Sequence, residues 1–360
     1  MLPLGLFFVF PLAVFVLSKE YYSVDNAILY QIKNQSAIIG FAYRNDNRGL
    51  KEMLVASKNP EVLALGTSIT GQFRKEFFIE SANFITASNA VVTLDEMKSF
   101  IEKLPPDNRT KLIIFGFGEE AFQDATKSPP KEKWSLSEVL IKSRLIYWDY
   151  LAGKFSLKDL WGQPRNMKNI GVNAFINNEG FREDGSYQYA RILTNPNRKE
   201  VLKTTIDGVV TGYQKDRKGT GYQYPVSDKI IESLNELLAL CQKKNMYVIG
   251  FLSPYPPERY QEIIRLDDVY TERALQLPKT VGKVFSDYGF DFYNFSDISV
   301  LGLDKNNTEF ADSTHGTDKL FLRITMHMAE RNKQLQKYVD LSKVQELLQN
   351  TKNDFLEFSL

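Results

Sequence analysis

The stretch Glu61-Val-Leu-Ala-Leu-Gly-Thr-Ser-Ile-Thr70 joins a short apolar run to a turn that carries a serine. Four consecutive apolar residues followed by a turn are typical of a central parallel strand that is covered on both faces. Gly66 allows a sharp turn, which places Ser68 just beyond the carboxyl end of the strand. In open α/β sheets the active crevice lies outside these strand ends. Ser68 is therefore a candidate nucleophile, provided that a base can reach it.

The candidate base lies in a second stretch, Ala311-Asp-Ser-Thr-His-Gly-Thr-Asp318. Asp312 and His315 are three residues apart, so one turn of chain can bring the carboxylate against the imidazole. The carboxylate would fix the tautomer and stabilise the imidazolium as it forms. The other histidine, His327, lies in a helical pattern and is interpreted as structural. Two alternatives stay open, a helix N-cap for Ser68 and a loop histidine bonded to a backbone carbonyl for His315.

Together the two motifs resemble the SGNH/GDSL hydrolase superfamily. Gly66-Thr67-Ser68 stands where that superfamily has Gly-Asp-Ser, and Asp312-Ser-Thr-His315 matches its Asp-x-x-His block. The segment Gly180-Phe-Arg-Glu-Asp-Gly-Ser186 is also similar to segments of membrane-anchored members. The resemblance implies a catalytic set of Ser68, Asp312 and His315, and it covers about residues 59–118 and 226–330.

Apolar runs alternate with helical patterns along much of the chain, which predicts a three-layer α/β/α fold with a parallel five-stranded sheet. The resemblance implies the flavodoxin-like strand order 2-1-3-4-5. The expected strands lie at about 62–65, 83–90, 111–118, 246–254 and 290–296, and the expected helices at about 49–57, 71–78, 93–104, 227–244, 261–288, 320–329 and 341–348.

A large insertion, about 119–225, interrupts this alternation inside a catalytic domain predicted for 59–330. So long a segment is more typical of a lid or binding loop than of an idle connection. Its Asp184-Gly185 pair predicts a turn. Its tryptophans, Trp134, Trp148 and Trp161, favour either a small satellite core or a platform for sugar rings. The remaining predicted units are an N-terminal membrane anchor or signal segment at 1–19, a membrane-proximal lead-in at 20–58 and a C-terminal helical tail at 331–360.

The N-terminal run from Leu2 to Leu17 contains no charged residue. As a helix it would be about 24 Å long, slightly short of a hydrocarbon core of about 30 Å. An uncleaved signal-anchor, a cleaved signal peptide and a buried core helix are all compatible with it. We favour the anchor because the run has no polar face, and we expect the body on the periplasmic or cell-surface side of the membrane.

Composition narrows the function classes. The net charge of +1 gives no reason to expect nucleic acid, which calls for a basic face. A single cysteine, Cys241, excludes an internal disulfide framework and a cysteine-rich metal site, and its helical pattern indicates a buried structural thiol. Two distant histidines offer no metal site. No glycine pattern for a nucleotide lies at a strand–helix junction, so no cofactor is expected.

The oxyanion donors depart from the family pattern. The resemblance implies donors from the Ser68 backbone N–H, from a glycine after the second strand and from the asparagine of a Gly-x-Asn-Asp block. The chain has Ser88-Asn-Ala90 and Gly116-Phe-Gly-Glu119 at these places, so the asparagine is absent. The candidates for oxyanion or substrate binding are then Asn89, Ala90, Gly116 and Gly118.

An anchor, a degenerate asparagine block and a large insertion resemble the proteins of alginate O-acetylation and teichoic-acid D-alanylation. That resemblance implies an extracytoplasmic serine acyltransferase or esterase that acts on O-acyl groups of a cell-envelope polysaccharide beside a membrane-bound O-acyltransferase partner. Two alternatives stay open. One is a plain carboxylesterase or lipase for a small ester, and the other is a non-catalytic glycan-binding or accessory subunit.

Overall fold

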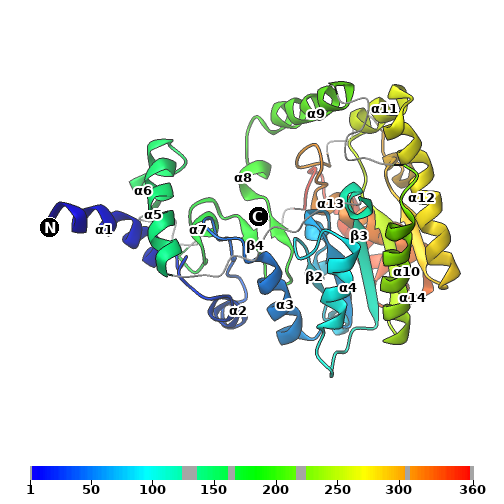
Figure 1. Cartoon of the computed structure of the whole chain (residues 1–360), viewed down its shortest axis with the longest axis horizontal. Coiled ribbons are helices and arrows are strands. Elements are labelled where there is room, and N and C mark those ends of the chain that lie inside the picture. The colour runs from blue at the N-terminus through cyan, green and yellow to red at the C-terminus, as the bar shows by residue number, and fades with distance from the viewer. Residues whose placement is uncertain (1, 124–135, 161–166, 216–223, 305–308, 357–360) are drawn as a thin grey trace.

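A five-stranded parallel sheet forms the centre of the molecule (Figure 1). The computed structural model describes residues 2–123, 136–160, 167–215, 224–304 and 309–356. The strand order is β2-β1-β3-β6-β7, which in chain order is the expected 2-1-3-4-5. The strands are β1 (Val62–Gly66), β2 (Ile85–Ala87), β3 (Leu112–Phe117), β6 (Tyr247–Leu252) and β7 (Asp291–Asn294).

Helices cover both faces of this sheet, so the predicted three-layer α/β/α fold is confirmed. Along β1, Leu63 and Leu65 pack into one apolar cluster, whereas Val62 and Ala64 pack into another. Cys241 is fully buried in the first cluster, as expected of a structural thiol. The first cluster is covered by α3 (Asn47–Lys58), α4 (Leu94–Glu102), α10 (Asp228–Lys243) and α12 (Val269–Asp287), and the second by α13 (Asp318–Arg331), α14 (Lys333–Gln336) and α15 (Leu341–Asn350).

Two expected helices are wrong. In place of a helix at 71–78, the chain makes three short 3-10 turns, because Phe73 and Phe78 adopt extended backbone. Both rings are buried in the second apolar cluster, so tertiary packing overrides the local helical pattern. The expected helix at 261–288 is divided at Asp267, whose φ of 50° ends one helix, and Asp268 caps the next. The elements are η1 (Ser68–Gln72), η2 (Lys75–Phe77), η3 (Glu80–Ala82) and α11 (Pro257–Leu266).

The insertion is mainly helical and is divided among three places. Its last long helix packs on α11, its hairpin lies beside Thr86 of the edge strand β2, and its first helices join the N-terminus. The turn predicted at Asp184-Gly185 is confirmed, and Gly185 has a φ of +80°. The elements are η4 (Glu119–Phe122), α5 (Leu136–Leu151), α6 (Leu157–Leu160), α7 (Val172–Asn177), β4 (Gly180–Phe181), β5 (Tyr187–Gln188), α8 (Ala190–Leu193) and α9 (Arg198–Lys215).

The helices α1 (Leu2–Leu17), α5 and α6 form an arm that projects from the α/β body (Figure 1). A satellite core of Val14, Phe15, Ile146, Phe155 and neighbouring rings joins this arm to the body. Trp148 is exposed and takes no part in that core. Trp134 and Trp161 lie outside the described residues. Within the described ranges, no helix combines the length and the apolar character needed to cross a membrane.

The segments on either side of the predicted catalytic domain pack against its core. Leu50 and Leu54 of the lead-in belong to the cluster under the sheet, and α2 (Val24–Lys33) packs against α3. Val344 and Leu356 of the tail belong to the opposite cluster. Both segments bury apolar side chains against the α/β core, so a helical tail is present but it is part of the same body.

Candidate active site

Ser68 lies at the carboxyl end of β1, as the sequence predicts. Gly66 is needed there because a Cβ atom would come within 2.5 Å of the Gly116 carbonyl oxygen and 2.9 Å of Thr70 Cγ2. The backbone then turns at Thr67, which occupies the N-cap position of η1, so Ser68 is its first residue and not its cap. The Ser68 side chain is consequently available for another partner.

The loop that carries His315 is held in shape by its own hydrogen bonds. An antiparallel bridge pairs Phe310 with Gly316, and the Ala311 N–H donates to the His315 carbonyl oxygen at 2.7 Å. Asp312 Oδ1 accepts the backbone N–H groups of Thr314 and His315, each at 2.8 Å. The turn therefore folds the Asp312 carboxylate back toward the imidazole that follows it.

Asp312, His315 and Ser68 form one hydrogen-bonded chain. His315 Nδ1 lies 2.8 Å from Asp312 Oδ2, and His315 Nε2 lies 2.7 Å from Ser68 Oγ. A carboxylate against Nδ1 holds the proton on that nitrogen and leaves the Nε2 lone pair facing the serine. Burial by itself would raise the pKa of Asp312, but the His315 side chain and the backbone donors lower it overall, which keeps the carboxylate ionised. The structure thus brings together three residues that are up to 247 positions apart.

His327 plays no part in this chain. It lies on α13, where its ring packs edge-on against Tyr293 and Phe295 at centroid distances of 6.3 and 5.4 Å. Burial and the nearby Arg331 lower the pKa of the imidazole. This placement agrees with the structural interpretation of His327.

A cavity of about 400 Å³ opens in front of Ser68 and His315. Besides Ser68 and His315, three parts of the chain line it: residues 39–50 of the lead-in, the turn after β2 and the hairpin of the insertion. The lead-in contribution was not predicted, since no motif marks it. The only sequence signal for the hairpin contribution was the neighbouring segment Gly180–Ser186, which ends just before Tyr187. The lining residues are Ile39, Gly40, Phe41, Arg44, Asn45, Asn47, Leu50, Ser68, Asn89, Phe181, Tyr187, Tyr189 and His315.

Two tyrosines of the hairpin form an aromatic wall beside the imidazole. The Tyr189 ring lies 5.6 Å from the His315 ring, and the Tyr187 ring lies 4.7 Å from that of Tyr189, both as centroid distances. Burial raises the pKa of Tyr187 to about 12 and that of Tyr189 well above its ordinary value. Both phenols therefore stay neutral, and Tyr189 limits the space in which the His315 ring can move.

Buried polar contacts hold the hairpin in place. The Thr86 N–H donates to the Asp184 carbonyl oxygen at 2.8 Å, and Asp184 accepts the Ser186 hydroxyl at 2.6 Å. Lys51, on α3, is fully buried and donates to the Gly185 carbonyl oxygen, with its ammonium 3.7 Å from the centre of the Phe181 ring. Burial lowers the pKa of Lys51 to about 7, although the Asp184 charge opposes that shift.

Of the four predicted oxyanion or substrate-binding residues, only Asn89 lines this cavity. It occupies the turn after β2 with a φ of 58°, a left-handed conformation that asparagine tolerates. Ala90 is buried in the core. Gly116 lies within β3, close to Thr70 and Phe251, and Gly118 follows that strand. Ala90, Gly116 and Gly118 do not line the cavity.

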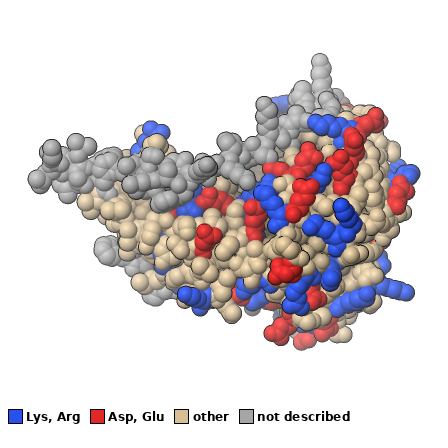
Figure 2. Space-filling model, turned by 60° about the horizontal axis from the view of Figure 1, so that its bottom comes forward, with Lys and Arg blue, Asp and Glu red and all other residues tan. Residues whose placement is uncertain are grey.

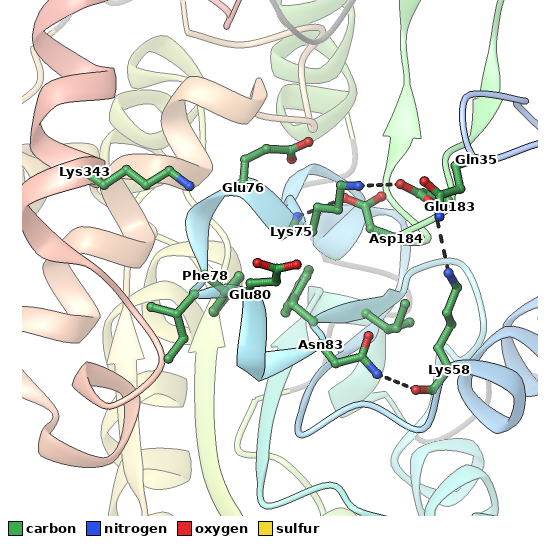
Figure 3. Close-up of a pocket in the computed structure, with 13 residues that line it drawn as sticks. Gln35, Lys58, Lys75, Glu76, Phe78, Glu80, Asn83, Glu183, Asp184 and Lys343 are labelled. Atoms are coloured by element: carbon green, nitrogen blue, oxygen red, sulfur yellow. Dashed lines mark hydrogen bonds and ion pairs between the residues drawn. The ribbon is translucent and has the colours of Figure 1, made fainter. Parts of the chain in front are cut away.

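A second cavity, of about 490 Å³, lies on the other side of the hairpin tip (Figure 3). Two of its lysines share one carboxylate: Glu183 forms ion pairs with Lys75 and Lys58. The close-up shows Glu76 and Glu80 on the same wall and Lys343 reaching in from α15. This cavity contains neither histidine nor the candidate serine, so it offers no nucleophile with a base.

Among the described residues, no group of three or more His, Cys, Asp or Glu side chains is arranged to hold a metal ion. A serine hydroxyl bonded to an imidazole that a carboxylate orients is an arrangement capable of acyl transfer. Comparisons with protein-family models, with curated proteins and with solved structures found no match for this chain.

Proposed function

We propose that this chain is an SGNH-type serine enzyme that transfers or hydrolyses O-acyl groups of a cell-envelope polysaccharide outside the cytoplasm. The observation that carries the proposal is the hydrogen-bonded chain from Asp312 through His315 to Ser68. A nucleophile bonded to a base, with the base oriented by a carboxylate, is the arrangement that activates a serine hydroxyl for attack on an ester.

The proposed reaction has two halves. Ser68 Oγ forms a bond to the ester carbonyl carbon while its proton passes to His315 Nε2. The tetrahedral intermediate collapses, the ester C–O bond breaks, and His315 returns the proton to the departing alcohol. In the second half, His315 removes a proton from an acceptor hydroxyl, whose oxygen forms a bond to the acyl carbon. The bond between that carbon and Ser68 Oγ then breaks, and His315 returns the proton to Ser68. Asp312 stabilises the imidazolium at both stages and keeps its own charge.

The oxyanion of each intermediate needs positioned donors, and removing one typically costs about 10²–10³ in rate. We assign one donor to the Ser68 backbone N–H and one to the Asn89 side-chain amide. Asn89 lines the same cavity as Ser68 and His315. In the family pattern the asparagine donor would follow β3, where this chain has none. The Asn89 amide, which follows β2, would take over that role.

The lining of the cavity supports a polar acceptor. Asn45 and Asn47 offer amide groups, and Tyr187 and Tyr189 offer aromatic rings. Sugars suit such a mixture, because their hydroxyls bond to amides and their ring faces pack on aromatic rings. A lipase would need a longer apolar channel for the acyl chain. This composition favours transfer to, or removal from, a glycan.

Hydrolysis of a small ester is the second candidate. Ser68 and His315 are only partly buried, and the His315 side chain keeps 21 % of its surface exposed. Water could therefore reach an acyl-serine as readily as a sugar. The family resemblance adds the remaining elements of the proposal: an N-terminal anchor formed by α1 and a membrane-bound O-acyltransferase as partner.

The test is covalent labelling of the full-length chain in detergent by a fluorophosphonate probe, with Ser68→Ala as control. We expect labelling of the wild type and none of the variant, since the probe reports an activated serine. Equal labelling of both would contradict the assignment of Ser68. If the folded wild type took no label but bound glycan, the result would contradict an enzymatic function and support a non-catalytic binding subunit.

A further inference from the structure

Exposed apolar side chains gather on the arm. Of the fifteen large apolar side chains that are exposed in the described part of the chain, nine lie on α1, α5 and α6. These helices hold about a tenth of the residues. Figure 2 shows charged side chains spread over the α/β body, whereas α1 of the arm has no charged residue in its sequence. Single exposed apolar residues are ordinary, but a concentration of this kind marks a contact surface.

On α1 the exposed residues form one stripe. Val9, Leu12 and Val16 are 54–59 % exposed and follow a spacing of three and four residues. Val14 and Phe15, on the opposite side, are buried in the satellite core. The fold therefore uses one side of α1 and leaves an equally apolar side uncovered.

The helix α5 repeats this arrangement. Ile141, Leu145 and Trp148 are 40–68 % exposed at positions i, i+4 and i+7, and Leu151 at i+10 is 74 % exposed. Ile146 faces the satellite core with no exposure. A helix that buries one apolar stripe internally and exposes another has a second partner outside the body.

Lipid fits this surface better than a protein partner. The sixteen residues of α1 contain no charged or hydrogen-bonding side chain that a protein could recognise. On α5 the exposed Trp148 and the exposed Arg144 lie one turn apart. An indole and a long cationic side chain beside an apolar stripe are typical of helices that lie at the boundary between acyl chains and headgroups.

The arm is fastened to the wall of the active-site cavity. The buried Glu20, just after α1, accepts the N–H groups of Ala42, Tyr43 and Val172 at 2.7–3.0 Å. Ala42 and Tyr43 lie between the cavity residues Phe41 and Arg44. A membrane that binds the arm would therefore set the position of the cavity relative to the bilayer surface.

We propose that α5, through Ile141, Leu145, Trp148 and Leu151, is a second membrane-contact element that inserts beside α1 into the interface of a bilayer. The inference rests on the proposed membrane association of α1, but it does not depend on the Ser68 chemistry. The insertion thus holds a membrane-binding helix as well as the hairpin of the site, and the enzyme would act within a fixed distance of the lipid surface.

The experiment uses the full-length chain with Trp148 as the only tryptophan, through Trp134→Phe and Trp161→Phe. Vesicles of equal parts phosphatidylcholine and phosphatidylglycerol are added, with bromine on the acyl chains for quenching. We expect a blue shift and quenching of Trp148. The matched control carries Leu275→Trp with all three natural tryptophans changed to Phe. Leu275 is an exposed residue of α12, 44 % accessible, and its indole should not be quenched.

A second pair of variants removes the apolar contact. Leu145→Glu with Leu151→Glu should weaken vesicle binding by about tenfold or more, because two apolar side chains that insert into lipid are replaced by charged ones. Leu275→Glu with Val300→Glu should leave binding unchanged. Vesicle binding with no quenching of Trp148 would overturn the proposal. So would a blue shift that depends on protein concentration and not on lipid, which would assign this face to a second copy of the chain. Labelling of Ser68 by the fluorophosphonate probe is measured on the same protein. If Ser68 is labelled while Trp148 does not contact lipid, the membrane-contact proposal fails and the proposed function does not.

Discussion

The two cavities on either side of one hairpin differ in chemistry more than in size. The cavity at Ser68 has a volume of about 400 Å³ and the cavity in Figure 3 about 490 Å³. The arms of the hairpin, through Phe181 and Tyr187, line the first, and its tip, through Glu183 and Asp184, lines the second.

The difference lies in how the polar groups are paired. In the second cavity the Glu183 carboxylate forms ion pairs with Lys58 and Lys75. In the first cavity, hydrogen bonds link Asp312 to His315 and His315 to Ser68. Ser68, at the end of this chain, lines the cavity. The volume of a cavity does not identify an active site. The arrangement of its polar groups around a reacting atom does.

The largest expected effect comes from removing the base. His315→Ala should reduce esterase or transferase turnover by about 10⁴-fold or more, because serine enzymes lose nearly all catalysis with any essential triad member. The measurement is steady-state hydrolysis of an aryl acetate together with fluorophosphonate labelling. Thermal unfolding of the variant should stay close to that of the wild type, since His315 is a partly exposed loop residue.

His327→Ala is the matched control, because it removes the other histidine of the chain. Its ring packs on Tyr293 and Phe295, so a small loss of stability with unchanged turnover is expected. If His327→Ala abolished turnover and His315→Ala did not, the candidate site would be wrong.

Lys51→Met tests the support beneath the hairpin through the pH dependence of stability. In the folded protein the Lys51 pKa is lowered to about 7, while in the unfolded chain it is near 10.4. Between these values the unfolded chain binds more protons, so the free energy of unfolding of the wild type should rise with pH. The variant lacks this titration.

The measurement is urea unfolding of both proteins at about pH 6, 8 and 9.5. As the pH rises, the free energy of unfolding of the wild type should increase relative to that of the variant. Below about pH 7 the wild type retains the full cost of a buried ammonium. Parallel pH profiles for the two proteins would mean that Lys51 titrates normally.

The smallest effect is expected in the second cavity. Glu183→Gln removes the partner of Lys58 and Lys75, whose side chains are 24 % and 50 % exposed. Pairs that are this accessible contribute about 0–1 kcal/mol, so turnover should change less than about twofold and stability by no more than about 1 kcal/mol. A loss of activity comparable to that of His315→Ala would break the distinction between the cavities and move function to the second one.

Much of the architecture was predictable because it depends on local patterns. The apolar runs that form β1, β3 and β6 are buried on both faces. Each can therefore be predicted as a strand from its own sequence. The helix at 71–78 and the undivided helix at 261–288 were wrong for the opposite reason. Their outcome depends on where Phe73 and Phe78 are buried and on the left-handed Asp267.

The candidate site divides in the same way. Ser68, Asp312 and His315 were predictable because two short motifs contain them, and their meeting follows from the position of strand ends in a parallel sheet. Phe41, Arg44 and Asn45 were not predictable, since they lie in a lead-in without a motif and reach the cavity only by packing. Ala90, Gly116 and Gly118 came from family spacing and do not line the cavity.

The sequence by itself determined the sheet, the order of the elements and the three residues of the Ser–His–Asp chain. The periodicity of apolar residues and the residue preferences of turns extend over only a few residues, so they can be recognised in short stretches of sequence. Only the tertiary structure decided which polar and aromatic groups surround Ser68 and which apolar helix faces remain uncovered. Those outcomes depend on contacts between segments more than 100 residues apart, such as Lys51 with Gly185 and Glu20 with Val172. No local pattern specifies such contacts, because they exist only once the chain has packed.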